Sequence, residues 1–493
     1  MEKARLMKHR LWWCGFALLV ILAAVVRCAI NPVTGQNQLM LISEQEELKI
    51  GNETYPNALW GGEGGGGEYK DEQLKQYLGQ IVRRVHGISH RPNLPLTFVV
   101  QNSSVPNAWA IPGHVAITRG LLAGLDNEAE FAFVMGHEIG HVSSRHSASQ
   151  MSWEMVTQLG LGLAGLAMTG TDYGDAVIGL GSVGSSMLLL KHSRDDELEA
   201  DRLGVVYMSK LGYDPRHAVT AHQNLQKISN EYMKSLGQKT QERNFFEDLL
   251  STHPRTQVRI EEIQQIIRNS PPTAVTGDGN NRQQFQAMIA GVKRANQVYV
   301  NYYDQAARSL VKRNFAEANN LLNKAITADR SQASFYALEG FVLLRSKNYQ
   351  EAERYFNGAL TLDKNYQPGL RGMGMLNYTR SNLAESVRYL KRSAALFPQD
   401  MASRYYLGMS YYKTNNFKQA VPHLAAFAQV KPKHASVHAV LGTCYEKLND
   451  LPSAYKQYSM QLQVAPGSES GRTASSRLSV IKPVLEKQNA TKK

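Results

Sequence analysis

The sequence predicts a predominantly α-helical α+β protein that is divided into two domains. Its 493 residues exceed what one compact core usually contains. A repeat of 34 residues fills the C-terminal part, and apolar residues recur at helical spacing around the stretch GHEIGHVSSRH in the N-terminal part. We therefore expect a first domain over residues 28–290, with helices and a small β-sheet. A helical repeat solenoid over residues 296–480 and a basic tail over residues 481–493 should follow it.

The positive charge of the chain is concentrated in its C-terminal part. Lys and Arg exceed Asp and Glu by 13 in total, and residues 301–493 hold 27 basic and 13 acidic residues, whereas residues 1–300 hold 28 and 29. A basic excess can indicate binding to nucleic acid or to an anionic membrane. Since this excess is confined to the repeats, we expect no nucleic-acid partner.

Residues 1–27 have the pattern of an export signal. Four basic residues precede an uncharged, mostly apolar run from Leu11 to Val26, as in a secretory signal. The run is short for a membrane span, and both cleavage of this segment and its retention as a signal anchor stay open. Cys28 follows directly, which is typical of a lipoprotein whose mature chain begins with an acylated cysteine. However, Arg27 stands where such a signal has a small residue.

Five units of the C-terminal part share one sequence pattern. Related pentapeptides recur every 34 residues: NFAEA at 314, NYQEA at 348, NLAES at 382, NFKQA at 416 and DLPSA at 450. Glycines keep the same period at Gly340, Gly374, Gly408 and Gly442. Because a glycine lets two helices approach closely, this pattern resembles the tetratricopeptide repeat. Such a solenoid has a concave groove, which here is basic and rich in tyrosine. We expect acidic or aromatic partner segments in it; the alternative is a solvated face without a ligand.

The stretch DNEAEFAFVMGHEIGHVSSRH predicts a helix that carries metal ligands. Its apolar residues recur at helical spacing, and Asn127 with Glu130 would form a capping box at its start. On this helix His137 and His141 are one turn apart, so both imidazoles can reach one zinc ion, and Glu138 can reach a water beside it.

A third ligand has to come from elsewhere in the chain. His146 does not fit a metzincin site, because Ser144 and Ser147 stand where that pattern requires Gly and His; we expect it to be a surface or packing residue. The stretch SRDDELEADRLG places Glu197 and Asp201 on one face of another helix. Glu197 would complete a His, His, Glu set, and Asp201 would hold a ligand histidine through a hydrogen bond.

HEIGH followed by SRDDELEAD resembles the zinc metallopeptidase family that includes HtpX, the CAAX prenyl endopeptidases and the BepA-like periplasmic proteases. Further matches are NPVTGQNQLMLISEQEE from residue 31, NAWAIPGHVAITRGLL from residue 107 and STHPRTQVRI from residue 251. The resemblance implies a gluzincin-like domain with one Zn²⁺ per chain in the periplasm, where attachment through a lipidated Cys28 or a signal anchor stays open. It also implies an edge strand that pairs with an extended substrate, and we expect Asn107, Ala108 and Trp109 to line the cleft.

Two segments have more than one interpretation. The resemblance implies that His253 can take the open zinc position and keep the enzyme latent, whereas His253 could also cap a helix, pack or contact substrate. Residues 159–190 are apolar and rich in glycine, but Asp172 and Asp175 interrupt them. We favour a lid or plug near the active site over a membrane span for this segment.

Three functions follow from these features. The first is a zinc endopeptidase that cleaves misfolded or stalled envelope proteins held by its repeats, with the outer-membrane assembly machinery as a neighbour. The second is a chaperone or scaffold for outer-membrane assembly whose protease is normally latent. The third is an integral-membrane peptidase of the HtpX kind, with residues 11–26 and 159–190 as spans.

Overall fold

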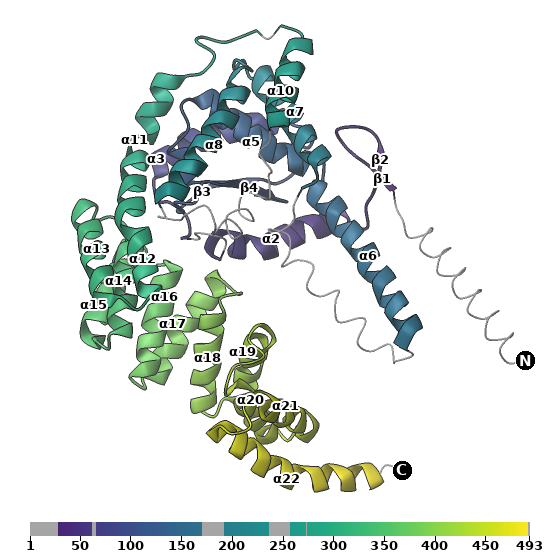
Figure 1. The fold of residues 1–493 in the computed structure, drawn as a ribbon, viewed down its shortest axis with the longest axis vertical. Coiled ribbons are helices and arrows are strands. Elements are labelled where there is room, and N and C mark those ends of the chain that lie inside the picture. Colours follow the sequence, from purple (N-terminus) through teal and green to yellow (C-terminus); the bar gives the residue numbers. More distant parts are fainter. Residues whose placement is uncertain (1–27, 62–65, 170–191, 236–256, 273, 492–493) are drawn as a thin grey trace, which may run out of the picture. The chain divides into compact units, whose positions relative to one another are not determined.

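The computed structural model describes residues 28–61, 66–169, 192–235, 257–272 and 274–491 (Figure 1). The chain divides into two compact units, Met1–Gln297 and Val298–Lys493. The first unit is helical with a small β-sheet and the second consists of helices, which confirms the predicted fold class. The predicted export signal lies outside the described residues. Among the helices that the structure describes, none has the length and apolar character that crossing a membrane requires.

A three-stranded sheet organises the first unit. Its strands are β3 (Thr97–Gln101), β4 (Ala108–Ile111) and β5 (His114–Thr118), in the order β3-β5-β4. β3 runs parallel to β5, whereas β4 pairs antiparallel with β5. Within the described part of the chain, β4 is therefore an edge strand. A separate antiparallel hairpin is formed by β1 (Cys28–Ile30) and β2 (Asn37–Leu39).

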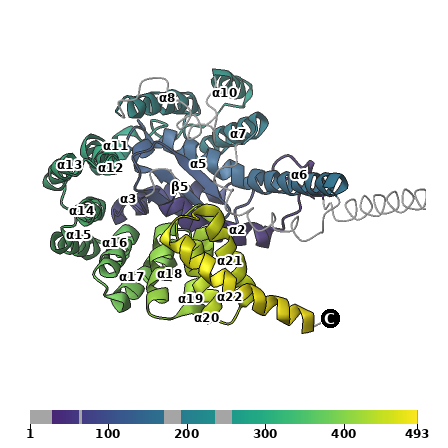
Figure 2. The same cartoon turned by 60° about the horizontal axis from the view of Figure 1, so that its bottom comes forward.

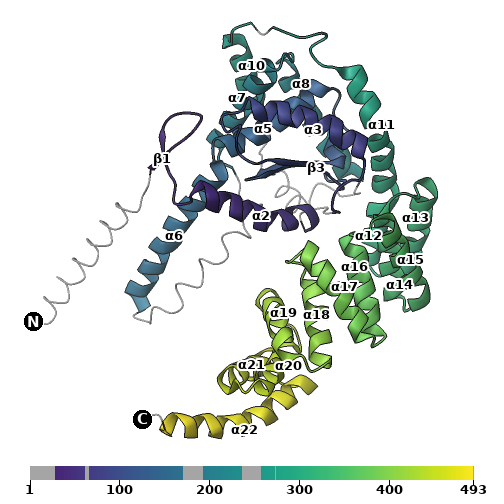
Figure 3. The same cartoon turned by 180° about the vertical axis from the view of Figure 1, so that it is seen from behind.

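The described helices of the first unit are α2 (Glu44–Trp60), α3 (Glu72–Gly87), α4 (Arg119–Leu122), α5 (Glu128–Ser143), α6 (His146–Thr169), α7 (Arg194–Lys210), α8 (His217–Ser235), α10 (Gln257–Asn269) and α11 (Arg282–Val298). Helix α2 lies on one face of the sheet, and α3 and α5 lie on the other (Figures 1 and 3). On the α2 face, Leu59 packs with Val99 and Ala116. On the other face, α3 and α5 share the largest core with Val100 and Ile117. The two faces thus have separate hydrophobic clusters.

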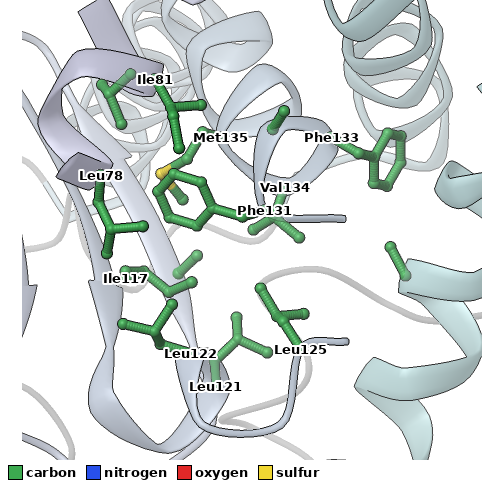
Figure 4. Close-up of a cluster of buried hydrophobic side chains, with 14 of the residues drawn as sticks. Leu78, Ile81, Ile117, Leu121, Leu122, Leu125, Phe131, Phe133, Val134 and Met135 are labelled. Atoms are coloured by element: carbon green, nitrogen blue, oxygen red, sulfur yellow. The ribbon is translucent and has the colours of Figure 1, made fainter. Parts of the chain in front are cut away.

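α5 is buried on every side. All of its residues from Glu128 to Ser143 are buried, as expected for a central helix without a polar face. Figure 4 shows Phe131 and Met135 toward Leu78 and Ile81, while Phe133 points away from them. The predicted cap at the start of this helix is half formed. The Asn127 side chain accepts from the Glu130 amide at 2.9 Å, but the Glu130 carboxylate accepts from the amide of Asp126.

The second unit begins with a π-helical turn, η2 (Tyr299–Tyr303), and continues as helices. They are α12 (Asp304–Val311), α13 (Phe315–Ala328), α14 (Ala333–Arg345), α15 (Tyr349–Leu362), α16 (Gln367–Thr379), α17 (Leu383–Leu396), α18 (Met401–Lys413), α19 (Phe417–Val430), α20 (Val437–Lys447), α21 (Leu451–Val464) and α22 (Glu469–Thr491). Figure 2 shows successive helices side by side in pairs. This arrangement is the helical solenoid that the 34-residue period predicts.

The periodic glycines lie where the two helices of a repeat touch. A Cβ atom added at Gly340 would lie 2.6 Å from the Phe356 ring, and one added at Gly374 would lie 2.4 Å from Leu390 Cγ. A second periodic feature was not apparent from the sequence. One residue in each turn between paired helices has a left-handed backbone, with φ between 59° and 65°: Arg313, Lys347, Ser381, Asn415 and Asn449.

Candidate metal centre

Close packing of α5 against α7 places the predicted ligands together. Glycines in α5 make this approach possible, because a Cβ added at Gly136 would lie 3.1 Å from Gly204 Cα. One added at Gly140 would lie 3.3 Å from Ala200 Cα. α7 is held at its start by Ser193, whose side chain and amide exchange hydrogen bonds with Asp196 in a capping box. The first turn of α7 therefore faces the HEIGH turn of α5.

The structure brings His137, His141 and Glu197 into one buried group. The Nε2 atoms of the two histidines are 3.1 Å apart. Glu197 Oε1 lies 3.4 Å from Nε2 of His141, and Glu197 Oε2 lies 3.7 Å from Nε2 of His137. All three ligand atoms lie within 4.8 Å of one another. In the sequence, Glu197 follows His141 by 56 residues. The packing of α7 against α5 brings the two side chains together.

This donor set fits zinc. Two nitrogens bound tetrahedrally at about 2.0–2.1 Å from zinc would be about 3.3 Å apart, close to the separation between the two histidines. Burial, with the neighbouring His192 next in importance, holds the pKa of His141 well below its usual range. His141 is therefore neutral at physiological pH, as a nitrogen ligand must be. Glu138 lies between the two histidines on α5 and is only 4% exposed.

Asp201, one turn along α7 from Glu197, contacts His137. Its Oδ1 lies 2.9 Å from His137 Nδ1 and 3.3 Å from His222 Nε2. Arg259 donates to both oxygens of Asp201, at 2.7 and 2.6 Å. Burial raises the pKa of Asp201, but the Arg259 guanidinium outweighs that effect and holds this pKa well below its usual range. Asp201 is therefore a buried carboxylate with a matched cation.

His146 is buried beside His141. The two Nδ1 atoms are 2.9 Å apart, and His146 Nε2 lies 3.4 Å from Glu199 Oε2. His192 also lies against His141, with the two rings stacked and their centroids 3.9 Å apart. His146 is thus a packing residue with polar partners, and the surface alternative for it was wrong. His141, His146 and His192 also form a second group that is compact enough to hold an ion.

The residues expected to line a cleft lie on and beside β4. Ala108 is buried in the core on the α5 face of the sheet. The Trp109 side chain lies on the α2 face, where it packs with Leu59, and its indole nitrogen donates to Gln101. The Asn107 amide donates to Thr118 Oγ1, and the Thr118 amide donates to the Asn107 carbonyl, each at 2.9 Å. Their role in lining a cleft stays a prediction.

Two sequence interpretations fall wholly or partly outside the described residues. His253 lies in the segment 236–256, which the structure does not describe, so its proximity to the metal set stays a prediction. Of the apolar stretch 159–190, only residues 159–169 are described, as the C-terminal part of α6. The lid interpretation of that stretch likewise stays a prediction.

Sequence reasoning missed two residues that contact this group, Arg259 on α10 and His222 on α8. Arg259 is 4% exposed and its Nη1 lies 2.6 Å from Glu197 Oε2. In the sequence, its stretch STHPRTQVRI resembles the metallopeptidase family but carries no metal-binding pattern of its own. No spacing rule links an arginine on a third helix to Glu197, but a buried position in an amphipathic helix was a usable signal.

Comparison with known proteins agrees with this geometry. Residues 70–267 match the model of peptidase family M48, and residues 303–366 and 405–463 match a tetratricopeptide repeat model. The mitochondrial metalloendopeptidase OMA1 of Arabidopsis thaliana is 30% identical over 230 residues, which are 45% of this chain and 42% of that protein. The beta-barrel assembly-enhancing protease of Escherichia coli is 27% identical over 211 residues, 42% of this chain and 41% of that protein.

The chain therefore spans about two fifths of the length of these curated relatives. Among solved structures, the tetratricopeptide repeat protein YrrB aligns with 39% of this chain and 97% of its own at 20% identity and a TM-score of 0.31. Both family matches confirm the resemblances drawn from HEIGH, SRDDELEAD and the repeats. The chain contains a metallopeptidase domain of family M48 followed by tetratricopeptide repeats.

Proposed function

We propose that this protein is a zinc-dependent endopeptidase of the bacterial cell envelope that hydrolyses misfolded or stalled envelope proteins. The observation that supports this most strongly is the buried group of His137, His141 and Glu197, with Glu138 beside it on the same helix. Two imidazoles and one carboxylate supply three ligands and leave a fourth position for water, as in catalytic rather than structural zinc sites.

The catalytic roles follow from the side chains. Bound zinc would supply the Lewis acidity that polarises the scissile carbonyl and makes an attacking water more acidic. Glu138 would accept the proton of that water and deliver it to the leaving amine nitrogen. Asp201 holds the His137 ring through Nδ1, so Nε2 of that ring stays directed at the metal position.

Substrate recognition would use two parts of the chain. Within the described residues, the outer edge of β4 pairs with no other strand. It can therefore pair with an extended peptide through main-chain hydrogen bonds, which favours unfolded segments and little sequence specificity. The repeats would hold the client. Their helices offer cations over aromatic rings, with Lys413 Nζ 4.4 Å from the Tyr378 ring centre and the Arg371 guanidinium 5.1 Å from that of Phe341. Acidic and aromatic client segments suit such a surface.

The place of action would be the periplasm, because residues 1–27 have the pattern of an export signal. Attachment to the membrane through a lipidated Cys28 or a retained anchor is part of this proposal. A role in outer-membrane protein quality control accords with a relative that is named a beta-barrel assembly-enhancing protease.

The experiment that tests this function compares the wild type with Glu138→Gln on an unfolded outer-membrane β-barrel protein. The wild type should cleave it, whereas Glu138→Gln should capture it intact. Lys413→Glu, introduced into the Glu138→Gln chain, should weaken capture of acidic clients. A zinc-loaded wild type that binds the client without cleaving it would overturn the peptidase proposal. If Glu138→Gln then supported assembly as well as the wild type, the scaffold function would replace it.

A further inference from the structure

A series of polar contacts leads from the proposed ligand His141, through the buried His146, to the carboxylate of Glu199. His141 and His146 are 3% and 4% exposed. Their Nδ1 atoms are 2.9 Å apart, and on the far side of His146, Nε2 lies 3.4 Å from Glu199 Oε2 and 3.5 Å from Asp196 Oδ1. Glu199 is itself fixed, because Ser144 Oγ donates to its Oε1 at 2.8 Å.

The direction of these hydrogen bonds is determined by the metal set. His141 Nε2 faces His137 and Glu197 and must offer a lone pair there, so the proton of this ring is on Nδ1. His146 Nδ1 must then accept, which puts the proton of His146 on Nε2, facing Glu199. Each donor in this series of contacts thus meets an acceptor, and only one tautomer of each histidine satisfies every contact.

We propose that His146 and Glu199 are positioning residues that fix the ring and the tautomer of His141 as a metal ligand. This inference rests on the proposed zinc peptidase function. His137 has its own anchor in Asp201 and Arg259, and the His146–Glu199 pair does the same for the other histidine. Outer contacts of this kind orient ligand histidines in metal sites.

The position of the pair also ties the two ligand-bearing helices together. His146 begins α6, directly after the end of α5, whereas Glu199 lies on α7 between Glu197 and Asp201. A contact between them therefore holds the end of the HEIGH helix against the first turns of α7. The ring of His192 stacks on one face of the His141 ring, with centroids 3.9 Å apart. His141 is thus held on its Nδ1 side and on one face.

The test measures zinc affinity by competition with a chromogenic chelator, using the full-length chain. His146→Phe keeps a planar ring but removes the acceptor, and His146→Asn retains an acceptor near the position of Nδ1. Glu199→Gln removes the negative charge and so weakens the hydrogen bond from His146 Nε2 to residue 199. His86→Phe is the matched control, since this partly buried histidine bonds the Leu94 carbonyl at 2.8 Å and takes no part in the metal set. The d–d spectrum of each cobalt-substituted protein reports ligand geometry independently of activity.

We expect His146→Phe to weaken zinc binding about 10–100-fold, with kcat reduced at saturating zinc and KM little changed. His146→Asn should recover most of this loss, and Glu199→Gln should show a smaller loss in the same direction. His86→Phe should match the wild type. If His146→Phe fails to fold, Glu199→Gln and His146→Asn still give the ordered series.

Three results would overturn the inference. If His146→Phe and Glu199→Gln both keep the zinc affinity and the cobalt spectrum of the wild type, the pair contributes only to packing. Equal losses in His146→Phe and His146→Asn would show that the acceptor is irrelevant. Two ions per wild-type chain, one of them lost in His146→Phe, would make His146 a ligand of a second metal. A wild type that binds no zinc would instead overturn the proposed function, and this inference with it.

Discussion

Arg259 Nη1 lies 2.6 Å from Glu197 Oε2, so α10 provides a cation to the carboxylate that completes the metal set. The same guanidinium bonds both oxygens of Asp201. One buried arginine therefore compensates two buried carboxylates, one directed at the metal position and one directed at His137. This contact makes α10 part of the site, although its sequence carries no metal-binding motif.

Replacing Arg259 with Met should destabilise the peptidase unit strongly. Removal of one partner from a buried ion pair costs about 3–5 kcal/mol, because the remaining charges lose their compensation. Urea unfolding with a chelator present measures this loss, and added zinc should restore part of it by supplying positive charge beside Glu197. Arg259→Lys, which keeps the charge, is the control. A loss below about 1 kcal/mol in Arg259→Met would contradict this role.

Gly140→Ala should impair zinc binding more than stability. The added Cβ would lie 3.2 Å from Leu203 Cβ and 3.3 Å from Ala200 Cα, so α7 must move by a few tenths of an ångström and carry Glu197 with it. Gly291→Ala is the matched control, because a Cβ there meets no atom within 4 Å. It should raise stability by up to about 1 kcal/mol. Chelator competition and thermal unfolding of both variants distinguish the two effects, and unchanged zinc affinity in Gly140→Ala would argue against helix spacing as the determinant.

Acidification should destabilise the peptidase unit through His114. Burial lowers the pKa of this histidine to about 4, whereas its unfolded value is about 6.5. The unfolded chain therefore takes up a proton first, so stability that is present above pH 6.5 is lost as the pH falls toward 4. The neutral ring bonds Thr97 and Asn52 and stacks on Tyr55.

This contribution is measurable with His114→Gln. When the pH is lowered from 7.5 to 5, the free energy of unfolding of the wild type should fall by on the order of 1–2 kcal/mol more than that of the variant. Urea unfolding with a chelator present excludes any effect of zinc release. Identical pH dependence of the two proteins would mean that His114 does not titrate as its burial implies.

Much of the fold was predictable from the sequence because two kinds of periodicity are explicit in it. The 34-residue period predicted the helix pairs, and the glycines at 340 and 374 indeed lie where the helices touch. His137 and His141 follow from helix geometry alone, since residues four apart share a face. Glu197 followed from a second spacing of the same kind.

The remainder of the site depends on tertiary packing. Arg259 and His222 approach Asp201 from two further helices, and no local pattern fixes that meeting. His146 does not fit the metzincin spacing, but a residue that is not a ligand can still contact and orient one. The side of the sheet on which Trp109 lies depends on strand register, which follows from the pairing of Trp109 with Ala116.

Zinc content together with peptide-bond cleavage tests directly whether this protein is a zinc-dependent peptidase. The measurement compares the purified wild type, Glu138→Gln and Glu197→Gln for bound zinc and for cleavage of casein. We predict one zinc per chain in the wild type and in Glu138→Gln, and a marked loss of zinc in Glu197→Gln. Cleavage should fall about 10²–10⁴-fold in Glu138→Gln, because the general base is gone. A folded wild type without zinc, or a Glu138→Gln chain that cleaves casein at the wild-type rate, would rule out a zinc peptidase with Glu138 as its general base.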